Sequence, residues 1–223
     1  MFCIPNDVAV CMMYDDTGYV AGLQIAISHE DHTNTILDWS TLGYTNWTTV
    51  VDNTTQTFWT IQQYYVSKET LQLPKEDRIA LRNPNKILQE DYLWLTGYYG
   101  EVYAIPLLIE EYPDFQNQSC VDWMGDHYFN QVTPTTECVS EKLFPWFLVG
   151  KSGKIHGVTY WKLGIPEIPT EKRNWFERPS AASVRATAKN GPECLFKLAE
   201  ETGFIFMHIY FLDDPWNIIC QSG

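Results

Sequence analysis

The amino-acid sequence predicts a mainly β fold: one antiparallel domain over residues 1–223, a barrel or a sandwich, with two short helices near the C-terminus. Two observations predict this class. The chain holds 13 Tyr, 11 Phe and 9 Trp, and these residues, together with Val, Ile and Thr, favour pleated surfaces. Short apolar stretches are separated by turn signals with little helical periodicity between them, which is typical of antiparallel sheets.

The first half of the chain reads as a series of strands. Asp15-Asp16-Thr17-Gly18 predicts a turn between the first two of them. The last strand of this half is partly apolar on both faces, which suits the wall of a barrel or sandwich. The predicted strands cover residues 8–14, 19–28, 35–42, 47–52 and 57–66. The polar segment 67–86 predicts a loop with one short strand at 78–81.

The second half predicts two hairpins, an irregular segment and two helices. Glycine-containing turns separate the strands of each hairpin. The first helix begins at a capping Ser180 and ends before Asn190-Gly191, and the second has Pro192 in its first turn. The hairpin strands cover residues 88–95, 101–110, 144–149 and 155–163, the irregular segment covers 112–143, and the helices cover 180–189 and 192–202.

The run Phe204–Leu212 consists of apolar and aromatic residues apart from His208. A continuous apolar run is typical of a strand that is buried on both faces. We therefore expect this strand at the centre of a sheet, with His208 on the same face as Phe204, Phe206 and Tyr210.

The six cysteines predict disulfides, because their number is even and their spacing does not fit a zinc site. Disulfides persist in oxidising compartments, so the chain is expected to be secreted and extracellular. Short separation in sequence favours Cys3–Cys11 and Cys120–Cys138, which leaves Cys194–Cys220. The spacing does not exclude other pairings.

Three sequons support the same location, because Asn-X-Ser/Thr is the acceptor for N-glycosylation on the secretory route. The predicted glycosylation sites are Asn46, Asn53 and Asn117. The chain begins Met1-Phe2-Cys3 with no leader pattern, so we expect a mature sequence.

The charge balance and the length of the apolar runs argue against two classes of partner. Acidic residues number 28 and basic residues 15, a net charge of −13. Nucleic-acid binding is not expected, because the basic footprint that neutralises phosphates is missing. A membrane span is not expected either, because no apolar run is long enough to cross a bilayer.

Two histidines in aromatic surroundings are the candidates for chemistry. His127 follows Asp126 in a stretch rich in aromatic residues, and His208 lies in the late apolar strand. Burial lowers the pKa of an imidazole, and a neutral imidazole can act as a base or ligate a metal. We predict His127, His208 and Asp126 as catalytic residues if the two rings converge, with the metal and any cofactor left open. The alternative is two core histidines bonded to backbone carbonyls or Tyr hydroxyls.

The cluster His29-Glu30-Asp31-His32 is a weaker candidate. It departs from the H-E-x-x-H spacing of zinc peptidases and lies at a predicted strand end. It suits loose binding of a cation or, more simply, a solvated turn.

Three functions remain open. The first is binding of a small apolar or aromatic molecule in an aromatic-lined β cavity, with Trp123, Tyr128, Phe206 and Tyr210 as ligand-binding residues. The second is a secreted enzyme, an oxidoreductase or a hydrolase, that uses His127, His208 and Asp126. The third is an extracellular structural or recognition module. Nucleophile elbows and phosphate-binding loops are missing from the sequence.

Overall fold

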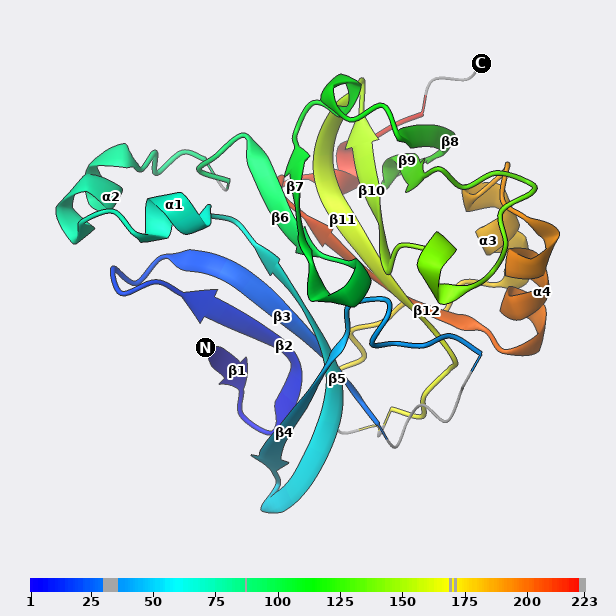
Figure 1. Cartoon of the computed structure of the whole chain (residues 1–223), viewed down its shortest axis with the longest axis horizontal. Helices are drawn as coiled ribbons and strands as arrows, with labels where there is room; N and C mark the ends of the chain where they lie inside the picture. Colours follow the sequence, from blue (N-terminus) through cyan, green and yellow to red (C-terminus); the bar gives the residue numbers. More distant parts are fainter. Residues whose placement is uncertain (30–35, 87, 169, 171, 221–223) are drawn as a thin grey trace. The chain divides into compact units, whose positions relative to one another are not determined.

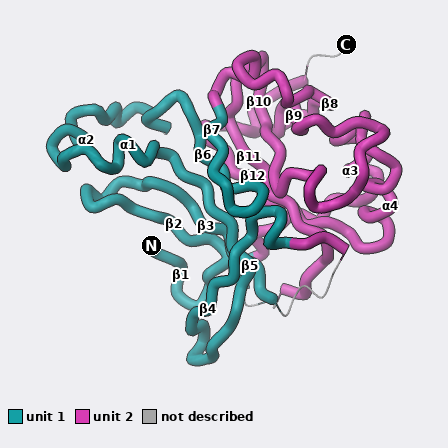
Figure 2. Tube along the Cα trace, viewed as in Figure 1, with its two compact units in different colours: residues 1–33, 39–105, 170–173 teal, residues 34–38, 106–169, 174–223 magenta. Residues whose placement is uncertain are grey.

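The computed structural model describes residues 1–29, 36–86, 88–168, 170 and 172–220 (Figure 1). The chain divides into two compact units (Figure 2). The first comprises residues 1–33, 39–105 and 170–173, and the second comprises 34–38, 106–169 and 174–223. That they fold as one domain stays a prediction.

The first unit is built on a seven-stranded sheet with the order β1-β2-β3-β5-β6-β7. β3 pairs along one side of β5, while β4 and β6 pair with different parts of its other side. The strands are β1 (Phe2–Ile4), β2 (Asp7–Tyr14), β3 (Val20–Ser28), β4 (Thr45–Val51), β5 (Thr54–Tyr64), β6 (Tyr92–Thr96) and β7 (Val102–Pro106).

The second unit is built on a five-stranded sheet with the order β12-β11-β10-β9-β8, in which every pair is antiparallel. Its strands are β8 (Phe115–Val121), β9 (Gly125–Asn130), β10 (Trp146–Lys151), β11 (Lys154–Leu163) and β12 (Phe204–Tyr210). The mainly β, antiparallel class is confirmed. In the described part of the chain neither sheet closes into a barrel. Of the two predicted alternatives, barrel and sandwich, the sandwich-like one fits.

Four α-helices complete the described part of the fold, two in each unit. The predicted helices near the C-terminus are confirmed, and Ser180 caps the first of them through the backbone N–H of Ser183. The α-helices are α1 (Lys68–Leu71), α2 (Lys75–Leu81), α3 (Ala181–Thr187) and α4 (Glu193–Glu201). Short 3₁₀ turns are η1 (Tyr98–Gly100), η2 (Ile109–Glu111), η3 (Ser140–Lys142) and η4 (Pro215–Asn217).

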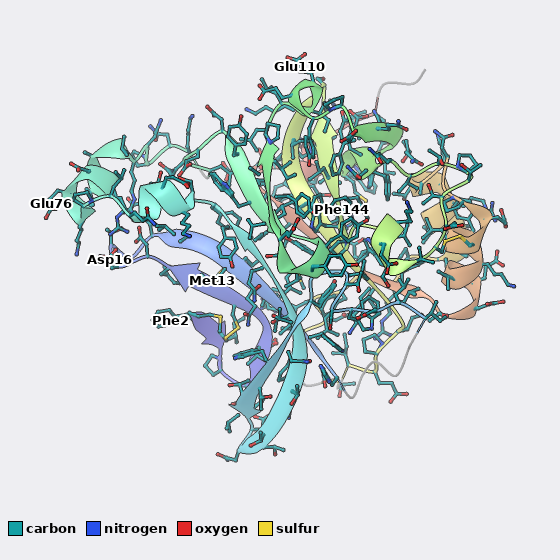
Figure 3. The ribbon with its side chains drawn as sticks, viewed as in Figure 1. Phe2, Met13, Asp16, Glu76, Glu110 and Phe144 are labelled. Carbon is teal, nitrogen blue, oxygen red and sulfur yellow. A yellow bond between two sulfur atoms is a disulfide. The ribbon has the colours of Figure 1, made fainter. Side chains whose placement is uncertain are left out.

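The loop with a short strand predicted over residues 67–86 is wrong, because this segment holds α1 and α2. Two arginines connect α2 to the turn between β2 and β3. Arg78 pairs with Asp15 and Asp16, and Arg82 pairs with Asp15 at 2.5 Å. Figure 3 shows Asp16 at the tip of this hairpin and Glu76 on α2. The helix depends on this tertiary contact, which the polar composition does not reveal.

Two further predictions about strands are wrong. The segment 112–143 was expected to be irregular, but it contains the hairpin of β8 and β9. The polar residues of β8 have low strand propensity, and pairing with β9 overrides it. Residues 36–42 form turns instead of a strand, although Leu37 and Leu42 are buried. Thr35, where that strand was to begin, lies outside the described residues.

β12 lies at the edge of its sheet and not at the centre. Its first four residues are nevertheless almost completely buried. Beyond its outer edge, Glu177 forms a short bridge with Phe206 through two backbone hydrogen bonds of 2.8 and 2.9 Å. The apolar run therefore indicates that both faces of the strand are buried. It does not distinguish a central strand from an edge strand that another segment covers.

One face of the second sheet is covered by α3 and α4, which lie side by side in Figure 1. Val184 and Leu195 from the helices approach Trp161, Phe204 and Phe206 of the sheet, around a gap of about 30 Å³. These side chains are nearly inaccessible. Each buried side chain of this size contributes about 1.5–3 kcal/mol.

The six cysteines form three disulfides, as expected, but only one predicted pairing is right. Cys3–Cys11 joins β1 to β2, next to Phe2 in Figure 3. The others are Cys120–Cys220 and Cys138–Cys194, in place of the predicted Cys120–Cys138 and Cys194–Cys220. The C-terminal segment runs beside the β8–β9 turn, where the Cys220 N–H donates to Asp122 at 2.7 Å. For these two disulfides, the cysteines that pair are close in space and not the ones closest in sequence.

None of the helices in the described residues has the length and apolarity that crossing a membrane requires.

The disulfides should differ in their effect on stability. Cys120–Cys220 closes a loop of 100 residues and Cys3–Cys11 a loop of 8. In the chain-entropy model their removal costs about 4.7 and about 2.5 kcal/mol respectively. Urea unfolding of Cys120→Ser/Cys220→Ser and Cys3→Ser/Cys11→Ser should therefore show the larger loss for the first pair. An equal loss for both pairs would contradict the loop-length argument.

Candidate functional site

The candidate site lies on the helix-covered face of the second sheet. Residues directly opposite each other in antiparallel strands share a face. One row across this face places His127 opposite Val149, Val149 opposite Gly157, and Gly157 opposite Tyr210. The next row places Phe147 opposite Thr159, and Thr159 opposite His208.

The residues that β11 contributes to the middle of this face are small. β9 and β12 are three strand spacings apart, roughly 14 Å. Between them β11 contributes only Gly157 and Thr159 to these two rows. A Cβ at Gly157 would lie 2.6 Å from a Val149 methyl group and 2.8 Å from the Ile209 carbonyl oxygen. The absence of a side chain there lets Val149 and Tyr210 pack closely against β11.

The two histidines converge. The ring centroids of His127 and His208 are 6.2 Å apart, and the rings meet edge to face at 82°. Phe147 lies against both, with its centroid 5.6 Å from His127 and 6.1 Å from His208. Tyr210 stacks on the other side of His208 at 6.0 Å. The imidazole pair is thus enclosed by aromatic rings.

Glu177 supplies the carboxylate of the site. The Nδ1–H of His208 donates to a Glu177 carboxylate oxygen at 2.8 Å. The His208 side chain is only 5% exposed, whereas that of Glu177 is 49% exposed. The other ring nitrogen, Nε2, is buried and has no hydrogen-bond partner among the described residues. When His208 is neutral, Nε2 carries the lone pair and can accept a hydrogen bond.

His127 is held as a neutral imidazole. Burial lowers its pKa to about 4, and the nearby His208 acts in the same direction. The backbone carbonyls of Gly125 and Ser119 offset part of this effect. The ring nitrogen Nδ1 lies 2.9 Å from the Gly125 carbonyl oxygen, which can accept its proton. His127 therefore adds polarity to the site near neutral pH without adding charge.

A cavity of about 320 Å³ opens beside the imidazole pair. Its size falls at the lower end of the range for small-molecule sites. One wall comes from the sheet and the opposite wall from the segment 177–187, which includes α3. The lining residues are Val121, Met124, His127, Phe147, Glu177, Arg178, Pro179, Ser183, Ala186, Thr187, Phe206 and His208.

Two of the other predicted site residues belong to this region. Phe206 lines the cavity, and Tyr210 supports His208 from behind by stacking. Burial raises the pKa of the Tyr210 hydroxyl, so this side chain stays protonated.

The remaining three lie elsewhere. Asp126 and Tyr128 flank His127 on β9, and neighbouring residues on a strand point to opposite faces. Asp126 acts on His156, where it offsets part of the pKa lowering caused by burial. Trp123 occupies the turn between β8 and β9 with a positive φ of 71° and is 65% exposed. The structure therefore replaces Asp126 by Glu177 as the carboxylate beside the imidazoles.

A metal centre is not formed by the described residues, since no group of three or more His, Cys, Asp or Glu is placed to hold an ion. Glu177 and Gly125 each occupy one nitrogen of the two imidazoles. In the His29–His32 cluster only His29 is described, and its ring stacks on Trp59 at 4.5 Å. The other three residues lie outside the described part.

Sequence reasoning missed Glu177, Phe147 and Ser183. Phe147 alternates with Val149 in a strand that was predicted, so its face could have been assigned once the partner strand was known. Glu177 lies in the segment Arg173–Pro179, which holds three charged residues and shows no periodicity. Only the backbone bridge to β12 places its side chain against His208.

Comparisons with protein-family models, curated proteins and solved structures give no match to this chain. The functional argument therefore rests on the geometry of the site.

The buried His127 predicts a pH-dependent stability. An unfolded imidazole titrates near 6.5, whereas His127 in the folded chain titrates at about 4. Between these values the unfolded state binds more protons, so stability falls as pH drops from about 6.5 to about 4. The loss from this residue amounts to roughly 3 kcal/mol in total. Urea unfolding of the wild type and His127→Phe should show a shallower pH dependence for the variant.

Between pH 7 and 8 residue 127 is neutral in both the wild type and His127→Phe. Their stabilities should therefore run parallel in that range. Identical slopes at pH 4–6.5 would show that His127 is not held neutral by burial.

Proposed function

We propose that the chain is a secreted protein whose second unit binds a small molecule with an apolar or aromatic body and one hydroxyl group. The observation that carries this proposal is the buried, unpartnered Nε2 of His208, a residue of the wall of a cavity large enough for such a ligand. The three disulfides support an oxidising compartment.

The body of the ligand is inferred from the walls. Phe147 and Phe206 offer ring surfaces, with centroids 5.6 Å apart. Val121, Met124 and Pro179 add apolar surface. Aromatic rings contribute about 0.5–1.5 kcal/mol per well-placed pair in addition to the area they bury. A planar ring of one or two cycles suits a cavity of this size.

The hydroxyl group is inferred from His208. A buried polar atom without a partner costs about 1–3 kcal/mol. A ligand hydroxyl that donates to Nε2 recovers this cost, because Glu177 already accepts the Nδ1–H and keeps Nε2 as the acceptor.

Two naphthalene probes of similar shape test this reading. 2-Naphthol carries the hydroxyl, and 2-methylnaphthalene replaces it by a methyl group. We expect 2-naphthol to bind roughly tenfold more tightly, the value of one net hydrogen bond. His208→Phe should remove this preference, and isothermal titration calorimetry measures both affinities. Equal affinity of the wild type for the two probes would exclude His208 as the anchor.

A matched pair of alanines tests the cavity itself. Ala182 and Ala186 are both exposed residues of α3, but only Ala186 lines the cavity. Ala186→Trp should fill the cavity and lower the affinity for 2-naphthol at least tenfold. Ala182→Trp should leave it within twofold of the wild type. If both variants bind as the wild type does, the ligand site lies elsewhere.

The second candidate function is a secreted hydrolase, and the Glu177–His208 pair favours it. An imidazole that a carboxylate orients at Nδ1, with an unpartnered Nε2, in a residue that lines a cavity, has the makings of a general base. His208 would take a proton from water that attacks an aryl ester in the cavity. We expect 2-naphthyl acetate to be hydrolysed above the buffer rate, and His208→Gln to lower kcat by roughly 100-fold. Turnover that is insensitive to this substitution would rule out the candidate.

A further inference from the structure

The free edges of the two sheets differ in how they are protected. An edge strand exposes unpaired backbone N–H and C=O groups, which can pair with another chain and cause aggregation. Among the described strands, β1 has only three residues, β7 ends in Pro106, and β12 is covered by the Glu177 bridge. Short length, proline and a covering segment are all known protections. β4, of seven residues, has none of these three. In β8, also of seven residues, Gln118 and Ser119 are covered by the end of α3 and the segment after it, but Gln116 and Asn117 are exposed.

The outer edge of β4 is open and accessible. Asp52 and Asn53 both have positive φ values, 51° and 60°, and Val51 pairs with Thr54 across this two-residue turn. Val51 and alternate residues before it are therefore bonded to β5, so Asn46, Thr48 and Val50 direct their backbone groups outward. All three of these residues are exposed, Val50 by 65%. In Figure 1 the turn of this hairpin extends beyond the rest of its sheet.

Neither open edge carries the charges that usually protect such strands. From Trp39 to Ser67 the sequence holds a single charged residue, Asp52. β8 runs from Phe115 to Val121 without any charge. An uncharged segment rich in Thr, Val and aromatic residues is the type that forms intermolecular β structure. These two edges need some other protection.

The three sequons lie at these two edges. Asn46 is in β4, Asn53 is in the adjoining turn, and Asn117 is in β8. All three asparagine side chains are exposed. The chain contains 223 residues and no further sequon, so every acceptor lies in β4, in its turn or in the exposed part of β8.

We propose that N-linked glycans at Asn46, Asn53 and Asn117 protect the open edges of β4 and β8 against strand addition. A second chain must approach to within about 4.8 Å to pair with an edge. A bulky, hydrated glycan at the edge prevents this approach in the way that a lysine or a proline does in other proteins. The inference rests on the secretory route but is independent of the ligand cavity.

The test uses the protein secreted from a eukaryotic host with high-mannose glycans. Mass spectrometry should find all three asparagines occupied. The triple variant Asn46→Gln/Asn53→Gln/Asn117→Gln should keep its circular dichroism spectrum. It should also show severalfold faster growth of light scattering and a thioflavin T signal. Endoglycosidase H treatment of the folded wild type should have the same effect, which separates edge protection from failure to fold.

Two control variants distinguish edge protection from a general solubilising effect. Lysine at all three positions (Asn46→Lys, Asn53→Lys, Asn117→Lys) removes the glycans but restores charge at the edges, so it should resist aggregation. In the glutamine triple variant, Lys75→Asn with Asp77→Thr creates a sequon on α2, outside both sheets. A glycan there should not prevent aggregation.

The proposal is overturned by any of four results. These are three unoccupied sequons, a glutamine variant that stays as monomeric as the wild type, a lysine variant that aggregates equally, or full protection by the glycan on α2. The 2-naphthol affinity of the glutamine variant should be unchanged, so failure of this proposal leaves the ligand site unaffected.

Discussion

The candidate site depends on the contact between Glu177 and the edge strand β12. Two backbone hydrogen bonds with Phe206 fix the position of Glu177, and its carboxylate accepts a third from His208. The same residue therefore covers the sheet edge, sets the orientation of an imidazole and begins the wall opposite the sheet. Backbone pairing is directional and short-ranged, so the bridge keeps the backbone of Glu177 within reach of His208.

A second constraint is the shortage of side-chain volume on β11. Protein interiors are packed as densely as organic crystals, so a cavity needs a specific origin. Gly157 leaves room for Val149 and Tyr210 to pack closely against β11. The cavity lies between the imidazoles, Phe147 and Phe206 on the sheet and the segment 177–187. This combination of an apolar wall with one unsatisfied acceptor is characteristic of sites that bind small molecules.

The open edges of the two sheets are protected against pairing with another chain in several different ways. Closure into a barrel would have removed all edges, but the described sheets are open. Each remaining edge is short, ends in proline, is covered or carries an acceptor for a glycan. The charge of −13 lies mostly outside the β4–β5 hairpin and β8. The aromatic and β-branched residues that build these sheets thus create an aggregation hazard that charge does not control.

The sequence by itself determined the class of the fold and several of its elements. Hairpin turns, helix caps and apolar runs are local signals, so the β10–β11 hairpin, α3, α4 and the apolar strand at 204–210 could be located from residue types alone. The alternation along β12 also placed His208, Phe206 and Tyr210 on one face. Cysteine number predicted that disulfides form.

Only the tertiary structure decided which segments meet. The order of strands placed β12 at an edge, and the path of the C-terminus paired Cys120 with Cys220. The tertiary structure also brought together His127 and His208, which are 81 positions apart in the sequence. The carboxylate that it places beside them is Glu177 and not Asp126. Pairing across a sheet depends on long-range geometry that leaves no periodicity in the sequence, which is why these features could not be read from it.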